Sequence, residues 1–235
     1  MADDRQDRLM SASWIDWVYP LPTLTDGREA TISDGFSAIE TADHRQHLGV
    51  DIMYRRVPSE VPALPRGTKL FYTPENTPVV AAYGGKIWNT NITSLGHSIT
   101  IDHGDVPEIG PAVTFYQHMA SFARDWKKGD VIRPGDVLGI VGGPIIGYPL
   151  HHLHFELWLP TRDEAIDPEP FMTKWARRHI GQLSIPAPVY KVVNDVVPER
   201  GGGIRLSTPL VIGIAATGLL VIGLAIGAAS GDDVA

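Results

Sequence analysis

The chain has 235 residues, a formal net charge of −7 at pH 7 and no cysteine. Its charged and apolar fractions are ordinary, so one folded body with a good core is expected. The acidic balance argues against nucleic acid as a partner, and the lack of cysteine excludes disulfides, thiolate ligands and cysteine nucleophiles. Any metal must therefore be held by histidine and carboxylate side chains.

The chain begins with an acidic stretch, MADDRQDR, that contains no apolar segment. This start is unlike a secretory signal peptide. We interpret residues 1–19 as an N-terminal extension and residues 20–181 as the folded body.

Within the body, short β-rich runs alternate with turn signals. The predicted strands cover residues 79–83, 86–89, 98–102, 113–118, 137–141 and 152–159. Short helices are expected near residues 38–44 and 168–178. The pattern predicts a mainly β fold, an antiparallel sheet with long loops.

The stretch HHLHFELW at residues 151–158 carries the strongest functional signal. On a strand, His152, His154 and Glu156 would share one face and the intervening apolar residues would face a core. Two imidazoles on one face form half of a tetrahedral zinc site. His47 and Asp51, four residues apart in HLGVD, offer the other half if they share a strand face, with Gly49 leaving the space between them open.

The chain contains no HExxH pattern, so no glutamate base on a zinc-binding helix is expected. Glu156 lies beyond the histidines on the same predicted face. We interpret its carboxylate as a structural partner of the ligands, not as the catalytic base.

The C-terminal part differs from the body in composition. Residues 182–207 are rich in proline and glycine and are predicted to be a linker. Residues 208–230 contain the charge-free run PLVIGIAATGLLVIGLAIGAA, which has the length of a transmembrane helix. Residues 231–235 form an acidic tail, and the lipid bilayer is therefore an expected partner.

Three motifs in the body occur in a recognisable order: HLGVD at residues 47–51, YQHM at 116–119 and HLHFE at 152–156. Together with TPVVAAYGGKI at 77–87, IDHG at 101–104 and KGDVIRPGDVLG at 128–139, they resemble the lysostaphin/LytM-type zinc endopeptidases of peptidoglycan. The resemblance covers about residues 20–171. It implies the corresponding β fold with an open groove.

Carried over by position, the resemblance implies that His47, Asp51 and His154 hold one zinc ion. It implies that His118 and His152 are the catalytic histidines, and the division of roles between them stays open. The loop at residues 143–151 departs from the family pattern, which puts the substrate preference in doubt. The other histidines are expected to be structural or at the surface, namely His44, His97, His103, His151 and His179.

The expected function is hydrolysis of a peptide bond in the stem or cross-bridge of peptidoglycan. Two alternatives stay open. The body could be an inactive module that binds cell wall or activates another hydrolase, or the protein could be chiefly a membrane-anchored structural component.

Charges around the apolar run bear on localisation. Arg200 and Arg205 precede it, while Asp232 and Asp233 follow it. The positive-inside tendency then places the body on the cytoplasmic side, where peptidoglycan is absent. We therefore interpret the protein as a membrane-anchored component of a bacteriophage virion, located in an internal membrane or in the tail. Virion proteins are then expected as further partners. The alternative is an enzyme of the bacterial envelope.

Overall fold

The computed structural model describes residues 9–37, 46–57, 70–142, 151–159 and 164–185. The chain divides into two compact units, Met1–Lys191 and Val192–Ala235. All described residues belong to the first unit. The predicted linker beyond residue 185, the predicted membrane span at 208–230 and the helix expected near 38–44 lie outside the described residues.

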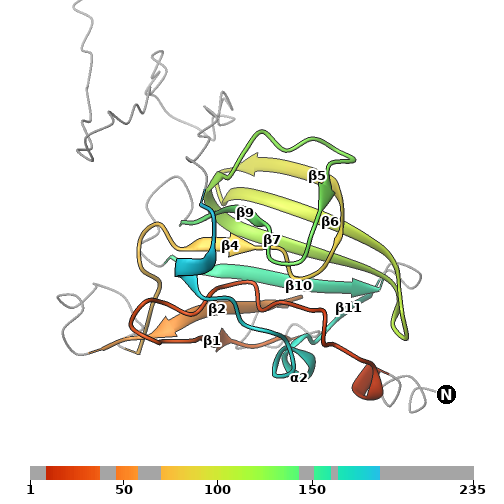
Figure 1. The fold of residues 1–235 in the computed structure, drawn as a ribbon, viewed down its shortest axis with the longest axis horizontal. Helices are drawn as coiled ribbons and strands as arrows, with labels where there is room; N and C mark the ends of the chain where they lie inside the picture. Colours follow the sequence, from red (N-terminus) through yellow and green to blue (C-terminus); the bar gives the residue numbers. More distant parts are fainter. Residues whose placement is uncertain (1–8, 38–45, 58–69, 143–150, 160–163, 186–235) are drawn as a thin grey trace, which may run out of the picture. The chain divides into compact units, whose positions relative to one another are not determined.

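The described part is built mainly of strands (Figure 1). The strands are β1 (Ala30–Asp34), β2 (Val50–Arg55), β3 (Phe71–Tyr72), β4 (Pro78–Val80), β5 (Gly85–Thr93), β6 (Gly96–Val106), β7 (Gly110–Phe122), β8 (Val131–Ile132), β9 (Val137–Val141), β10 (Leu153–Leu159) and β11 (Glu164–Ile166). One short α-helix, α2 (Glu169–Met172), and one 3-10 turn, Ile180–Gln182, follow them.

The described strands form one sheet whose main path runs β1-β2-β10-β7-β6-β5-β8. Each of their pairings is antiparallel. β11 extends the sheet beside β10, and β9 joins β4 to β7. The prediction of a mainly β, antiparallel fold is therefore confirmed for this part of the chain.

The core lies on one face of β10, as the alternation in its sequence requires. Leu153, Phe155 and Leu157 are fully buried, whereas Glu156 and Trp158 on the other face are partly exposed. The apolar face fixes the register, because a slip of one residue would bury the polar side chains. The strand thereby holds its histidine and its glutamate on a defined side.

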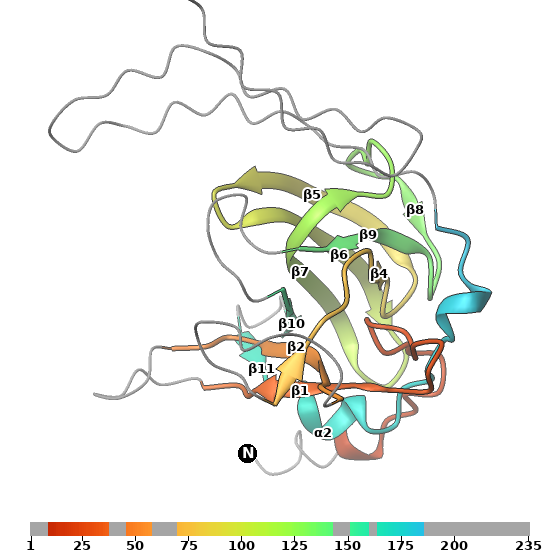
Figure 2. The same cartoon turned by 90° about the vertical axis from the view of Figure 1, so that its left-hand side faces the viewer.

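The segment before residue 20 contributes to this core. Trp14 and Trp17 are buried, and both contact Trp175 with ring centroids 6.0 and 5.0 Å away. Val18 and Thr23 form parallel bridges to residues 176 and 179, so the segment runs beside the last described residues (Figure 2). The core therefore includes residues that precede residue 20, where the body was expected to begin.

The helix expected over residues 168–178 is limited to α2, whose four residues end at Met172. Beyond it, residues 176–180 pair with the N-terminal segment in extended conformation, and this pairing replaces the continuation of the helix. In the part of the chain that the structure describes, no helix has the length and apolar character needed to cross a membrane.

Candidate metal centre

Two neighbouring strands and the turn before one of them bring three predicted ligands together. Asp51 is the second residue of β2, and it pairs directly with His154 on β10. His47 is not on the strand, contrary to the sequence interpretation: it forms an isolated bridge with Ser37, three residues before β2 begins. The turn at residues 48–49 therefore returns the imidazole towards Asp51.

Gly49 allows the close approach of this turn to β10. A Cβ atom at Gly49 would lie 2.3 Å from the carbonyl oxygen of Phe155 and 2.8 Å from Cγ of Glu156. The sequence interpretation, in which this glycine leaves a space open between two ligands, is wrong. The missing side chain instead lets backbone pack on backbone.

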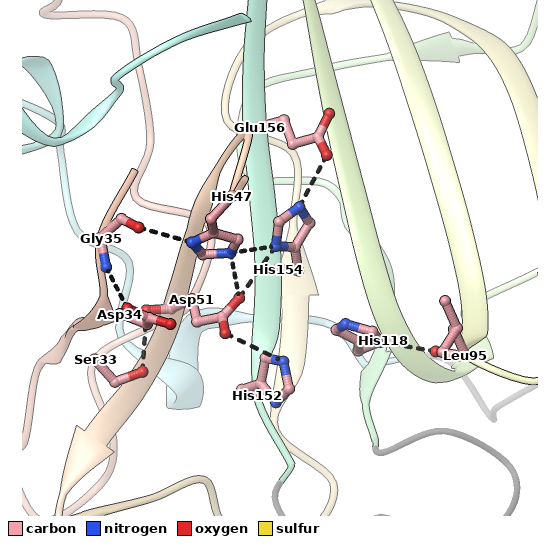
Figure 3. Close-up of polar contacts among 10 residues, drawn as sticks. All are labelled: Ser33, Asp34, Gly35, His47, Asp51, Leu95, His118, His152, His154 and Glu156. Carbon is pink, nitrogen blue, oxygen red and sulfur yellow. Dashed lines mark hydrogen bonds and ion pairs between the residues drawn. The ribbon is translucent and has the colours of Figure 1, made fainter. Parts of the chain in front are cut away.

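The donor atoms of the three residues converge (Figure 3). Nε2 of His47 lies 3.2 Å from Oδ1 of Asp51 and 3.0 Å from Nδ1 of His154. Nδ1 of His154 lies 3.1 Å from the same carboxylate oxygen. Two imidazole nitrogens and one carboxylate oxygen are the donor set that a zinc ion accepts.

Hydrogen bonds on the far side of each ring orient the free nitrogens. Nδ1–H of His47 donates to the carbonyl oxygen of Gly35 at 2.7 Å, and Nε2–H of His154 donates to Oε1 of Glu156 at 2.9 Å. When both rings are neutral, these bonds leave two lone pairs and a carboxylate oxygen directed at one point. A cation there would relieve their repulsion, so these residues fit a metal ion on their own chemistry.

The electrostatics agree with this reading. Burial raises the pKa of Asp51, but hydrogen bonds from His154 and His47 outweigh it and hold this pKa below its usual range. Burial lowers the pKa of His154, yet the carboxylates of Asp51 and Glu156 raise it to about 9. The hydrogen bond to Asp51 likewise raises the pKa of His47. The cluster favours bound positive charge.

The two predicted catalytic histidines lie together beside this cluster. The ring centroids of His118 and His152 are 4.6 Å apart, and Nε2 of His152 lies 3.5 Å from Oδ2 of Asp51. Nδ1–H of His118 donates to the carbonyl oxygen of Leu95 at 2.8 Å, which leaves its Nε2 as an acceptor. Burial lowers the pKa of His118 to about 4, so this ring is neutral at pH 7.

His118 occupies a distortion in β7. Its φ of 67° is left-handed, which is unfavourable for a residue with a Cβ atom. The pairing of β7 with β6 shifts here, since Tyr116 pairs with Ile99 and Met119 with His97. Two residues therefore oppose one, and this bulge re-aims the imidazole. Such strain is common at functional sites.

Sequence reasoning missed three groups that hold the site. The carbonyl oxygens of Gly35 and Leu95 orient two imidazoles, and no residue type announces such a role. The third is the indole of Trp158, whose Nε1–H donates to Oε2 of Glu156. Its spacing from Glu156 on the same strand was the available signal.

Of the other histidines, His97 and His103 are buried, which agrees with a structural role, and His179 is exposed. His151 is half-buried two residues before β10, while His44 and most of the loop at 143–151 lie outside the described residues.

Residues 64–168 match Peptidase family M23. The match contains His118, His152 and His154, whereas His47 and Asp51 lie upstream of it. A zinc-binding peptidase type agrees with the donor set that the structure brings together. Among curated proteins, none matches this sequence.

Solved structures with similar folds include three of interest. Helicobacter pylori Csd3 has 21% identity and a TM-score of 0.44, and the match covers 69% of this chain and 33% of the Csd3 chain. A putative glycyl-glycine endopeptidase lytM from Ruminococcus gnavus has 23% identity and a TM-score of 0.48, covering 70% and 62%. The SpoIIQ–SpoIIIAH pore-forming complex has 16% identity and a TM-score of 0.48, covering 70% and 95%. The chain thus spans only a third of the length of Csd3, and at these identities neither substrate nor activity carries over.

Proposed function

We propose that this chain is a zinc-dependent endopeptidase that hydrolyses peptide bonds in the stem or cross-bridge of peptidoglycan. The observation that carries the proposal is the convergence of Nε2 of His47, Oδ1 of Asp51 and Nδ1 of His154, with both ring tautomers fixed by hydrogen bonds. The match to Peptidase family M23 supports the reaction class.

A zinc ion bound to these three residues would lower the pKa of a coordinated water towards about 7 and polarise the scissile carbonyl. Next to it, His118 offers an unprotonated Nε2 that can accept a proton from the attacking water. His152 supplies a second imidazole, which can donate to the developing oxyanion or to the departing amine. The hydrogen bond to Leu95 holds His118 in the tautomer that an acceptor needs.

The test is zinc content and turnover of purified murein by the full chain. We expect one zinc per chain, and we expect His154→Ala to lose most of the metal and the activity. His179→Ala is the matched control, because it removes an exposed histidine outside the cluster and should change neither quantity. Full zinc occupancy in the His154 variant would refute the ligand assignment. Zinc binding without any turnover would favour the cell-wall-binding module.

We further propose that residues 208–230 anchor the enzyme in a bilayer, and that the protein travels in a bacteriophage virion. The support is the charge-free run and the order of arginines before it and aspartates after it. The full chain should partition into detergent, whereas a variant ending at Ser184 should not, yet should still hydrolyse murein. Protease cleavage of both ends from one side of a vesicle would contradict a single span. Detection of the protein in lysates of virus-free cultures would contradict its assignment to a virion.

A further inference from the structure

The sheet face that carries the metal cluster continues over three more strands. Glu156 on β10 pairs with Phe115 on β7, Phe115 pairs with Thr100 on β6, and Thr100 pairs with Asn89 on β5. Directly paired residues point to the same side of a sheet, so these side chains form one row on the side of His154. With neighbouring strands about 4.8 Å apart, Asn89 lies about 14 Å from Glu156.

A second bulge places a tryptophan at the end of this row. Ile87 pairs with Ile101 and Asn89 with Thr100, so Trp88 is the additional residue in β5. A bulge turns the side chain of an extra residue out of the normal alternation. Ile87 is buried, while the side chain of Trp88 is 47% exposed. Tryptophan is enriched at binding interfaces, because its large ring is apolar while its N–H can donate a hydrogen bond.

The turn at residues 127–130 completes the surroundings of the indole. Gly129 N–H donates to the carbonyl oxygen of Ile87 at 2.8 Å, and Ile87 N–H donates to that of Asp130 at 2.9 Å. These bonds fix the turn against β5. Trp88, Asn89, Thr100 and Lys128 line an open pocket of about 420 Å³, a volume within the range of small-molecule sites.

We propose that this pocket binds a sugar ring of the peptidoglycan glycan strand while the peptide lies at the metal centre. The proposal rests on the proposed function and adds a second contact to it. The carbon–hydrogen face of a pyranose can stack on the indole of Trp88. Its hydroxyl and acetamido groups can bond to the amide of Asn89, the hydroxyl of Thr100 and the ammonium of Lys128.

The spacing supports this occupant. An extended peptide rises about 3.3 Å per residue, so a span of about 14 Å across three strand spacings corresponds to about four residues. In peptidoglycan the peptide stem is attached to the sugar strand. A stem that extends from the metal centre along the row would therefore bring its sugar to Trp88.

The first test measures sugar binding alone, by calorimetry of the full chain with chitotetraose. Trp88→Ala should weaken binding at least about ten-fold, as expected for a central aromatic contact. Trp88→Phe should retain most of it, and Ile15→Ala, which removes another exposed apolar side chain, should leave it unchanged. No binding by the parent chain, or equal binding by Trp88→Ala, would overturn the proposal.

The second test separates the pocket from the chemistry. Trp88→Ala should lower kcat/KM on intact murein about ten-fold and leave kcat/KM on sugar-free cross-linked stem peptides unchanged. An equal loss on both substrates would show that Trp88 supports the fold or the metal centre, and would overturn the sugar site. If the parent chain hydrolyses neither substrate, the proposed function fails, whereas sugar binding is still decided by calorimetry.

Discussion

Replacing Glu156 with glutamine tests how the metal centre selects the tautomer of His154. The carboxylate accepts two hydrogen bonds on different oxygens, from Nε2–H of His154 and from Nε1–H of Trp158. Glutamine has only one carbonyl oxygen, and its amide nitrogen is a donor. It can therefore satisfy one of the two donors and must face the other with its own N–H groups.

Neither orientation of the glutamine satisfies both donors, and zinc binding requires the orientation that leaves Trp158 unsatisfied. If its oxygen accepts from His154, the partly buried indole N–H of Trp158 is left without an acceptor. If its oxygen accepts from Trp158, its amide donates to Nε2 of His154 and the ring proton moves to Nδ1, the atom needed for the metal. An unsatisfied buried donor costs about 1–3 kcal/mol. That range agrees with the 10- to 100-fold loss of affinity that is usual when such a carboxylate is removed.

We therefore expect Glu156→Gln to raise the zinc Kd by about 10- to 100-fold in competition titrations with a chelating indicator. The matched variant is Trp158→Phe, which removes the second donor and retains the aromatic ring. It should bind zinc nearly as well as the parent, and combined with Glu156→Gln it should recover most of the lost affinity, because the amide oxygen is then free for His154.

The double variant decides the reasoning. Recovery would give a coupling energy between Glu156 and Trp158, as a double-mutant cycle defines it. If Glu156→Gln binds zinc like the parent, the carboxylate does not select the tautomer. If the double variant binds no better than Glu156→Gln alone, the loss comes from the missing charge and the competition between two donors is refuted.

Three further predictions concern the paired histidines, the metal and a buried histidine outside the site. His118→Ala and His152→Ala should retain zinc by metal analysis and lose two or more orders of magnitude in murein turnover; near-normal rates in both would place proton transfer elsewhere. Removing zinc with a chelator should lower the thermal midpoint, because free zinc at about 100 times its Kd adds about 2.7 kcal/mol, and an unchanged midpoint would contradict a site of the folded state. Burial lowers the pKa of His103 from 6.5 in the unfolded chain to about 4 in the folded protein. The unfolded chain therefore binds a proton at His103 more readily. The stabilisation by neutral His103 is fully present above pH 6.5, and the free energy of unfolding should fall by about 3 kcal/mol as the pH drops to 4. Denaturant unfolding at pH 7 and 5 should show a smaller loss for His103→Gln, and parallel losses would contradict this origin.

The strand with the clearest periodicity was the most predictable part of the site. Alternation over residues 153–159 correctly indicated that one side of β10 is buried and that His154 shares the other side with Glu156. The partner strand was less predictable, because HLGVD has the same even spacing whether or not it is extended. Pairing between Asp51 and His154 is a long-range contact, and a local pattern does not determine which strands become neighbours.

Two other features had no local signal. Residues 1–19 were expected to be an extension outside the body, yet Trp14 and Trp17 pack with Trp175. The bulge at His118 was equally hidden, because the sequence around it reads as a regular strand. Both features depend on distant partners, namely the segment at residues 176–180 for the first and β6 for the second.

The buried face of β10 and its polar face depend on each other through the register. Phe155 is fully buried, and its carbonyl oxygen is the atom nearest to where a side chain at Gly49 would lie. The same backbone carries His154 and Glu156 on its other side, so the position of the core determines where the ligand ring and its carboxylate stand relative to Asp51. A slip of one residue would exchange the two faces and remove the metal donors together with the apolar packing. The packed core therefore fixes the positions of the metal-binding side chains on β10. The strained backbone at His118 belongs to the neighbouring strand β7.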